Sequence, residues 1–226
     1  MGVLFCYFSA YNLELLTMKK KLLLSLAILA SSFSFAQNLK VGVKAGMNVS
    51  SVQLKDFNTS ADYNSIFAYH FGAEFSLKLT NHLSLGADAL ISAEGYNEIY
   101  GFEDQHQTQY EFDTRQEIGF IKIPLYIKYY PVANVGLNIQ GGIQPGFLVY
   151  TRSKVTGSYE DSDLSFFDTH NVLNVFQVDI PVGVAYDFKK HLSVGARYSH
   201  ALIPVYEHQR GKLYNRTFMI NASYRF

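Results

Sequence analysis

Residues 39–50 read LKVGVKAGMNVS, and an apolar residue occupies every odd-numbered position of this stretch. The even-numbered positions hold Lys, Gly, Asn or Ser. Because successive side chains of a β-strand point to opposite faces, this alternation predicts a strand with one apolar and one polar face.

Period-two alternation returns along the rest of the chain, and no helical period competes with it. It marks seven further segments, at residues 67–79, 83–92, 121–129, 135–149, 177–188, 192–199 and 218–226. Many of these segments reach the roughly 9 to 11 residues that a tilted strand needs to cross a bilayer.

The predicted connections alternate between short and long. The short turns are residues 80–82, 131–134 and 189–191, and the long polar links are residues 51–66, 93–116, 151–175 and 201–215. Short turns at one rim and long loops at the other are typical of outer-membrane barrels, with the short turns in the periplasm. The expected fold is all-β, an eight-stranded antiparallel up-and-down transmembrane β-barrel with both termini on the periplasmic side.

The polar faces of the predicted strands carry many charges: Lys44, Glu74, Lys78, Asp88, Lys122, Lys128, Asp179, Asp187 and Arg197. A Lys or Arg that faces hydrocarbon at the bilayer midplane costs roughly 2 to 4 kcal/mol, so the apolar faces must point outward. The interior of an eight-stranded barrel is wide enough only for side chains to fill. We therefore expect a lumen of paired charges and no open pore.

Three prolines interrupt the predicted strands, at Pro124, Pro145 and Pro181. Proline has no N–H to donate to a strand ladder and normally avoids paired strands. Each of the three is therefore predicted to mark a bulge or the end of regular pairing.

The N-terminal region has the pattern of a secretory signal. Three lysines follow Met18, an apolar stretch runs from Leu22 to Ala30, and small residues stand at Ser34 and Ala36. A basic head, a short apolar middle and a small-x-small end describe a cleavable signal peptide. We expect residues 1–17 to be a mis-annotated upstream extension, residues 18–36 the signal peptide, and residues 37–226 the barrel domain.

Composition excludes several classes of function. The 19 Lys and Arg balance the 19 Asp and Glu, so the chain lacks the cationic excess that nucleic-acid binding requires. The single cysteine, Cys6, lies before the predicted cleavage point. The exported chain then has no thiol for a disulfide, a lipid anchor, thiol catalysis or a Cys-ligated zinc site.

Three segments carry a resemblance to a known family. Residues 120–130 read FIKIPLYIKYY, residues 141–146 read GGIQPG, and residues 192–199 read LSVGARYS. Together they resemble the PorT-type outer-membrane β-barrel family of Bacteroidetes, although Lys122 stands where that family typically has an acidic residue. The resemblance implies a small integral barrel, in a family with one namesake member that serves type IX secretion and gliding. The aromatic end at Phe226 resembles the last strand that the barrel assembly machinery recognises.

Few residues suggest a catalytic or ligand-binding role. Ser199 and His200 are adjacent, and adjacent strand residues point to opposite faces, so they cannot form a nucleophile–base pair. His70 and Glu74 share a face but lie roughly 13 Å apart along a strand, so each is expected to pair with a charge on a neighbouring strand. No catalytic, cofactor-binding or metal-binding residue is predicted.

The second and third long links are rich in acidic and aromatic residues. The acids are Glu98, Glu103, Asp104, Glu111, Asp113, Glu160, Asp161, Asp163 and Asp168, and the aromatics are Tyr100, Phe102, Tyr110, Phe112, Tyr159, Phe166 and Phe167. Calcium takes about six to eight oxygen ligands, but neither an EF-hand spacing nor a Gly-rich calcium repeat occurs, which favours solvated loops. The aromatics are expected to fold the loops or join the interfacial girdle, and the alternative is a contact surface.

The leading hypothesis is a non-enzymatic structural or interaction barrel in the outer membrane. Its expected partners are outer-membrane lipid and lipopolysaccharide, the barrel assembly machinery through Phe226, and a protein that contacts residues 93–116 and 151–175. A more specific form of this hypothesis is a role accessory to secretion. The alternatives are a lipid-modifying barrel enzyme and a soluble lipocalin-like calyx.

Overall fold

Antiparallel strands account for nearly all of the described structure. The computed structural model describes residues 38–55, 62–103, 109–133, 135–157, 173–188, 191–208 and 211–226. The strands are β1 Leu39–Lys55, β2 Asp62–Lys78, β3 Leu83–Glu103, β4 Gln109–Lys122, β5 Leu125–Tyr129, β6 Leu137–Gly157, β7 Phe176–Phe188, β8 Leu192–Ala201, β9 Tyr206–His208 and β10 Gly211–Arg225. The chain divides into two compact units, Met1–Leu39 and Lys40–Phe226, and the sheet apart from Leu39 lies in the second. Within the described ranges, no helix is long and apolar enough to cross a membrane.

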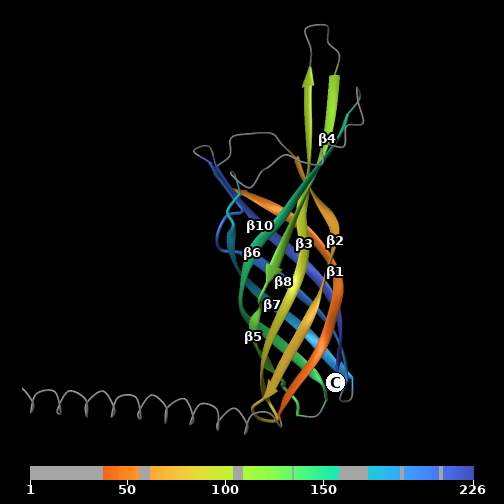
Figure 1. The fold of residues 1–226 in the computed structure, drawn as a ribbon, viewed down its shortest axis with the longest axis vertical. Coiled ribbons are helices and arrows are strands. Elements are labelled where there is room, and N and C mark those ends of the chain that lie inside the picture. The colour runs from red at the N-terminus through yellow and green to blue at the C-terminus, as the bar shows by residue number, and fades with distance from the viewer. Residues whose placement is uncertain are drawn as a thin grey trace, which may run out of the picture. The chain divides into compact units, whose positions relative to one another are not determined.

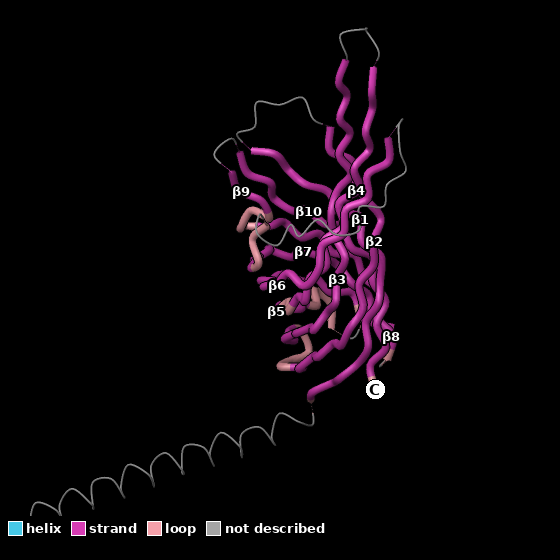
Figure 2. The backbone as a smooth tube through the Cα atoms, turned by 45° about the horizontal axis from the view of Figure 1, so that its top comes forward, coloured by secondary structure: helices cyan, strands magenta, loops and turns pink. Residues whose placement is uncertain are grey.

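The strands form one closed ring. Hydrogen-bonded neighbours follow the order β1-β2-β3-β4-β6-β7-β8-β10, and β10 then pairs with β1. This closing pair runs from Gly42↔Arg225 to Lys55↔Lys212 without a register shift. Figures 1 and 2 show the strands winding obliquely around a common axis. Closure removes the unpaired edges that a sheet cannot leave exposed to lipid.

β5 continues β4 within the same barrel strand. Both pair with β3 on one side and with β6 on the other. A short break at Ile123 and Pro124 separates them, as predicted for a proline, and the Ile123 N–H donates to the carbonyl of Pro145 at 2.9 Å. The three-residue β9 pairs with β10 at the rim, and its Tyr206 also forms an isolated bridge with Leu173. The ring therefore has the eight predicted barrel strands.

The other two prolines do not produce bulges. Pro145 and Pro181 lie inside β6 and β7, and the register between these strands is unchanged across both, although the pairing skips two rungs beside Pro181. The register shifts lie elsewhere, within 65–70 of β2 and at Gly119–Phe120 of β4. The predicted bulge is therefore absent at both prolines, but the other predicted outcome, an interruption of regular pairing, occurs beside Pro181, where the ladder with β6 omits two rungs. At Pro145 the ladder with β7 continues, whereas the ladder of β6 toward β4 and β5 is interrupted opposite Ile123 and Pro124.

A band of exposed apolar side chains surrounds the barrel. Its members include Val43, Met47, Phe71, Phe75, Leu85, Ile91, Ile121, Ile123, Leu125, Ile127, Ile139, Ile143, Val182, Val184, Val194 and Ile220, which are 38 to 61% exposed. Aromatic residues lie toward both ends of the band: Tyr129, Tyr186, Phe188, Tyr224 and Phe226 at one, and Phe67, Tyr69, Phe147, Phe176 and Phe218 at the other. An apolar band between two aromatic girdles is the outer surface of a transmembrane barrel. It contradicts the lipocalin-like alternative, in which the apolar face lines the interior.

Three connections between strands are short, as predicted. They connect β2 with β3, β5 with β6, and β7 with β8. The C-terminus lies at the same end of the barrel (Figure 1), because the Phe226 N–H donates to the carbonyl of Val41 at 2.9 Å. We name this the turn end, and the opposite end the hairpin end.

Residues 93–103 and 109–116, which the sequence predicts to lie in a long loop, belong to the paired strands β3 and β4. β3 and β4 pair from Leu90↔Lys122 to Glu103↔Gln109 without a register shift. Figure 1 shows this β3–β4 hairpin projecting beyond the other strands. β1 and β6 also run past their predicted ends, to Lys55 and Gly157. Residues 158–172 of the third predicted loop, and residues 1–37 with the predicted signal peptide, lie outside the described residues.

Candidate functional site

Ion pairs fill the inside of the barrel. In the described residues they join five cations with five anions, which are Lys44, Lys122, Lys128, Arg197 and Arg225 with Glu74, Asp88, Glu94, Asp179 and Asp187. All except Asp187, whose side chain is 11% exposed, are buried. The lumen formed by these residues therefore carries no net charge.

One cluster of these ions lies around Glu74 and Asp88. Lys128 Nζ lies 2.7 Å and Lys44 Nζ 3.6 Å from carboxylate oxygens of Glu74. Lys44 Nζ also lies 2.8 Å from Asp88, and Arg197 donates to the same carboxylate at 3.3 Å. Because every charge has an opposite partner, the cost of burying these ions is offset locally.

Tyr126 fills the space between these cations. Its hydroxyl donates to Asp88 at 2.8 Å, and its ring centroid lies 4.4 Å from the guanidinium carbon of Arg197. A Cβ on Gly86, the residue paired with Tyr126, would lie 2.2 Å from the ring. Only glycine leaves room for the ring here, so the pair of Gly86 and Tyr126 closes this level of the lumen.

A second cluster centres on Lys122. Its Nζ lies 2.6 Å from Glu94 Oε1 and 2.7 Å from Asp179 Oδ2. Gln144 Nε2 donates to Asp179 and Asn215 Nδ2 to Glu94, both at 2.9 Å. At the turn end, Arg225 pairs with Asp187, which also accepts from the Tyr130 hydroxyl at 2.8 Å. These layers agree with the predicted lumen of paired charges.

An apolar cluster lies in the lumen on the hairpin side of Lys122. Its buried members are Val52, Ile118, Phe120, Leu148, Val205 and Leu213. Residues 173–175 and 205–206 fold against it, with the Leu148 N–H donating to the carbonyl of Val175 and the Asn174 N–H to that of Val205. We call this cluster the apolar cap. It closes the barrel above the ion pairs.

The strand alternation does not predict the apolar cap. Val52, Ile118, Phe120 and Leu148 occupy the inward positions of their strands, where the strand alternation predicts polar residues. The signal in the sequence is this substitution of large apolar residues for polar ones, near the hairpin end of several strands. It indicates a core of the soluble type beyond the lipid-facing band.

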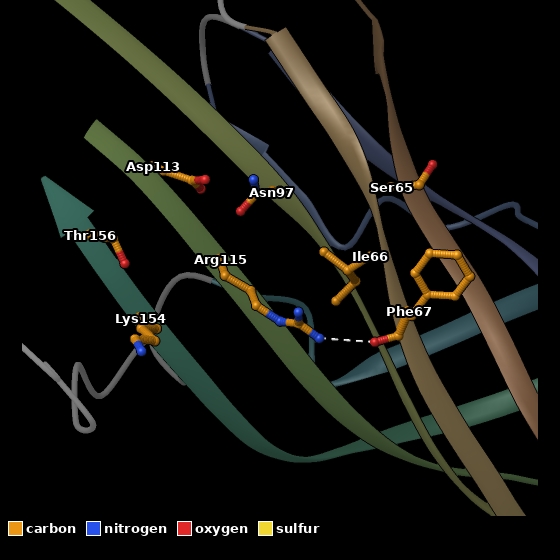
Figure 3. A pocket seen from close by; sticks show the side chains of 8 residues that line it. All are labelled: Ser65, Ile66, Phe67, Asn97, Asp113, Arg115, Lys154 and Thr156. Atoms are coloured by element: carbon orange, nitrogen blue, oxygen red, sulfur yellow. Dashed lines mark hydrogen bonds between the residues drawn. The ribbon is translucent and has the colours of Figure 1, made fainter. Parts of the chain in front are cut away.

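A groove of about 290 Å³ lies on the outer surface near the base of the β3–β4 hairpin (Figure 3). It is lined by Ser65, Ile66, Phe67, Asn97, Asp113, Arg115, Lys154 and Thr156. Figure 3 shows Arg115 reaching across to β2, where its guanidinium donates to the carbonyl of Phe67 at 2.9 Å. This carbonyl lies within the register shift of β2, so Arg115 satisfies a backbone group that the ladder with β3 does not.

Glu117 and Tyr150 lie next to this groove, in the rows just below Arg115. The Tyr150 hydroxyl donates to Glu117 Oε1 at 3.1 Å. The Tyr150 ring covers Gly119, its partner across the strands.

The structure keeps the candidate catalytic residues apart. Ser199 is buried and accepts from Gln144 at 3.4 Å, whereas His200 is part-exposed on the other face and stacks against Tyr214. Glu74 pairs with Lys128 as expected. His70 instead bonds a neutral partner, Asn48, at 2.6 Å, so the prediction of a charged partner is wrong for His70. Asn48 is held by Ser92 and Ala93, and this network leaves His70 no carboxylate to pair with.

Most acidic and aromatic residues of the predicted loops cannot be placed in a site. Only Glu98 and Asp113 of the acids have described side chains, and the side chains of all seven aromatics lie outside the described part. Among the described residues, no group of three His, Cys, Asp or Glu is arranged to hold a metal ion.

Similarity to known proteins is found among solved structures and in a family model. No curated protein matches the sequence. Among solved structures, Ail of Yersinia pestis is 12% identical with a TM-score of 0.40, covering 84% of this chain and 99% of its own. Neisserial surface protein A is 9% identical with a TM-score of 0.38, covering 82% and 97%. OprG of Pseudomonas aeruginosa is 15% identical with a TM-score of 0.36, covering 83% and 94%.

A family model gives the classification. It describes an outer membrane protein beta-barrel domain and matches residues 35–207, which include β1 to β8. The match agrees with the closed ring, the apolar outer band and the ion-paired lumen. The chain therefore belongs to the outer membrane protein beta-barrel domain family and is an outer-membrane protein.

Proposed function

We propose that this protein is a non-enzymatic, non-conducting outer-membrane barrel that presents the β3–β4 hairpin as a contact surface for another protein. The observation that carries the proposal is the uninterrupted pairing of β3 with β4 as far as Glu103↔Gln109, well beyond Ile91 and Ile121 at the edge of the lipid-facing band. A rigid ribbon of this length positions its tip more firmly than a loop does.

The closed lumen supports a non-conducting role. Two clusters of buried ion pairs and the apolar cap occupy successive levels of the barrel. Buried ion pairs with additional hydrogen bonds hold a fixed arrangement, and an ion that entered would have to displace them.

The proposed orientation places the turn end in the periplasm and the hairpin outside the cell. Short periplasmic turns and longer extracellular segments are the usual arrangement of outer-membrane barrels. In this orientation the hairpin reaches the medium or a neighbouring cell-surface protein. A role accessory to secretion, as the resemblance to PorT-type barrels implies, is one form of such a contact.

The absence of an enzymatic role is part of the proposal. Ser199 lies inside the barrel and His200 outside it, so this serine has no adjacent general base. Lipid analysis of a strain that lacks the gene provides the test. Unchanged lipid A and phospholipid mass spectra are expected, and a lost or gained acyl or headgroup modification would support an enzyme instead.

The contact surface is tested by shortening the hairpin. Residues 97–115 are replaced by an Asn-Gly turn, which joins the paired residues Tyr96 and Gln116. The shortened barrel is expected to insert and to migrate differently in gels before and after boiling, as the full chain should. A photo-crosslinking residue at Thr114 in the full chain is expected to give a defined adduct with one cell-surface protein.

The control places the same photo-crosslinking residue at Asn81, in the turn between β2 and β3. Asn81 is at the turn end and should not give the Thr114 adduct. Identical adducts at both positions, or none at Thr114 in intact cells, would contradict the proposed contact surface. A shortened barrel that fails to fold would contradict the assignment of the hairpin as an extension separate from the barrel wall.

A further inference from the structure

Three exposed cations lie together on the outer face of β4 and β6. Arg115 pairs across the strands with Lys154, and Glu117 pairs with Arg152 in the next row. Directly opposed residues have Cβ atoms about 4.5 to 5.5 Å apart, so the three cations occupy two adjacent rows of one face. Arg115, Arg152 and Lys154 are all exposed, whereas Gln116 and Ile118, on the other face of β4, are buried.

This face continues the lipid-facing surface. Ile121 of β4 and Val149 of β6 are exposed apolar residues of the band, and the bulge at Gly119 aligns Tyr150 with the same outer face. Arg152 lies three residues beyond Val149, which is about 10 Å along a strand. The cations thus lie at the height where lipid headgroups begin.

The three cations outnumber the two described acids on this face, Asp113 and Glu117. None of the three forms an ion pair within the described residues, in contrast to the cations of the lumen. Two acids lie on the same face: Asp113 is two residues before Arg115 on β4, and Glu117 stands directly opposite Arg152 and accepts from the Tyr150 hydroxyl. Arg115 donates to the Phe67 carbonyl, which fixes its guanidinium beside the groove (Figure 3).

The apolar band and the three adjacent cations together define the class of ligand. A molecule that contacts both the apolar band and this site needs acyl chains at one end and negative charge about one headgroup away. Guanidinium and ammonium groups recognise phosphate by charge-assisted hydrogen bonds. We propose that Arg115, Arg152 and Lys154 form a binding site for the phosphates of an acidic glycolipid of the outer leaflet, of the phosphorylated lipid A class.

In this arrangement the acyl chains lie along Ile121 and Phe147, and the phosphates reach the groove between Arg115 and Lys154. Asp113 lines the same groove and opposes the negative headgroup. The site therefore prefers a lipid with more than one phosphate, which can engage the cations in both rows. The inference rests on the orientation in the proposed function, which faces the hairpin end outward.

The experiment uses the full chain in detergent micelles, with diphosphoryl lipid A as the probe and native mass spectrometry as the readout. The triple variant Arg115→Gln, Arg152→Gln, Lys154→Gln is expected to lower the affinity on the order of 100-fold, because each of the three cations near a lipid surface contributes about a fivefold factor. Dephosphorylated lipid A should bind the wild type and the triple variant equally weakly. Excess inorganic phosphate should compete poorly, because it lacks the acyl chains.

Two further variants separate a specific site from general attraction. Asp113→Asn removes an opposing charge and should tighten binding, a gain that misfolding cannot mimic. Lys55→Gln and Lys212→Gln, on the paired strands β1 and β10, should leave binding unchanged. Equal losses from the Lys55 and Lys212 variants, or no loss from the triple variant, would overturn the inference.

Two further measurements report separately on folding and on the proposed protein contact. The triple variant should keep its heat-dependent gel shift and its crosslink from Thr114. Loss of lipid A binding with a preserved crosslink supports the lipid site alone. Loss of the crosslink with preserved lipid A binding overturns the proposed contact surface and leaves the lipid site intact.

Discussion

Lys122 and Asp179, 57 residues apart in the sequence, bring an ammonium nitrogen and a carboxylate oxygen within 2.7 Å inside the barrel. Their side chains are only 1% and 2% exposed. Glu94 completes the group at 2.6 Å from the same nitrogen, so one cation holds two acids from two different strands. A single side chain of β4 thus links β3 and β7 across the lumen.

Replacing Lys122 by Met is expected to destabilise the barrel by about 3–5 kcal/mol, because it leaves two buried carboxylates without a cation. Urea unfolding in lipid vesicles measures the change. Lys78→Met, at an exposed position of the turn end, is the control and should cost less than about 0.5 kcal/mol. Equal effects of the two variants would show that the ion pair does not contribute to stability.

Gly86→Ala is expected to destabilise the protein by about 1–3 kcal/mol, since the new methyl group overlaps the ring of Tyr126. Gly141→Ala is the matched control, because a Cβ at Gly141 meets nothing within 4 Å. Both variants are compared by the same unfolding measurement. A Gly86→Ala variant as stable as Gly141→Ala would mean that Tyr126 does not pack over this glycine.

Phe120→Ala is expected to cost about 3–5 kcal/mol, the range for removing a fully buried phenylalanine. The apolar cap lies beyond the lipid-facing band, so its loss resembles a cavity in a soluble core. The variant should still insert and still show the heat-dependent gel shift. A loss of insertion would indicate that the cap is needed for assembly as well as for stability.

The purified wild-type barrel is expected to add no conductance steps to a planar bilayer. The double variant Phe120→Ala, Leu213→Ala should also remain silent, because the Lys122 and Lys128 clusters still occupy the lumen below the cap. Steps in the wild type contradict a closed lumen. Steps only in the double variant assign closure to the apolar cap alone.

The sequence predicts the lipid-facing part of the barrel well. In strands such as 121–129, hydrocarbon on one side and a charged lumen on the other impose strict alternation, and the observed burial follows it. The identity of the ion pairs is not predictable in the same way. Whether Lys128 meets Glu74 or Asp88 depends on strand register and tilt, which the alternation does not contain.

The β3–β4 hairpin escaped prediction for the same reason. Beyond Ile91 and Ile121 both faces of the sheet meet water or other side chains, so residues 93–116 lose the regular alternation and appear loop-like. The alternation also does not predict the apolar cap. Ile118 and Phe120 are apolar residues at inward-facing positions, where the strands within the bilayer carry polar residues. In this extension of β3 and β4, the strand pairing continues the ladder of the bilayer region, and no alternation of apolar and polar residues specifies it.

Inside the barrel five cations are balanced by five anions, and nine of these ten side chains are buried. A change that removes one charge is tolerated only when a second change elsewhere in the interior restores neutrality. Substitutions of charged residues in this interior must then occur in compensating pairs. The net charge of the lumen is conserved, whereas the positions of the individual charges can change. Descendants of this barrel could share almost no interior residue with it and still enclose the same electrical balance.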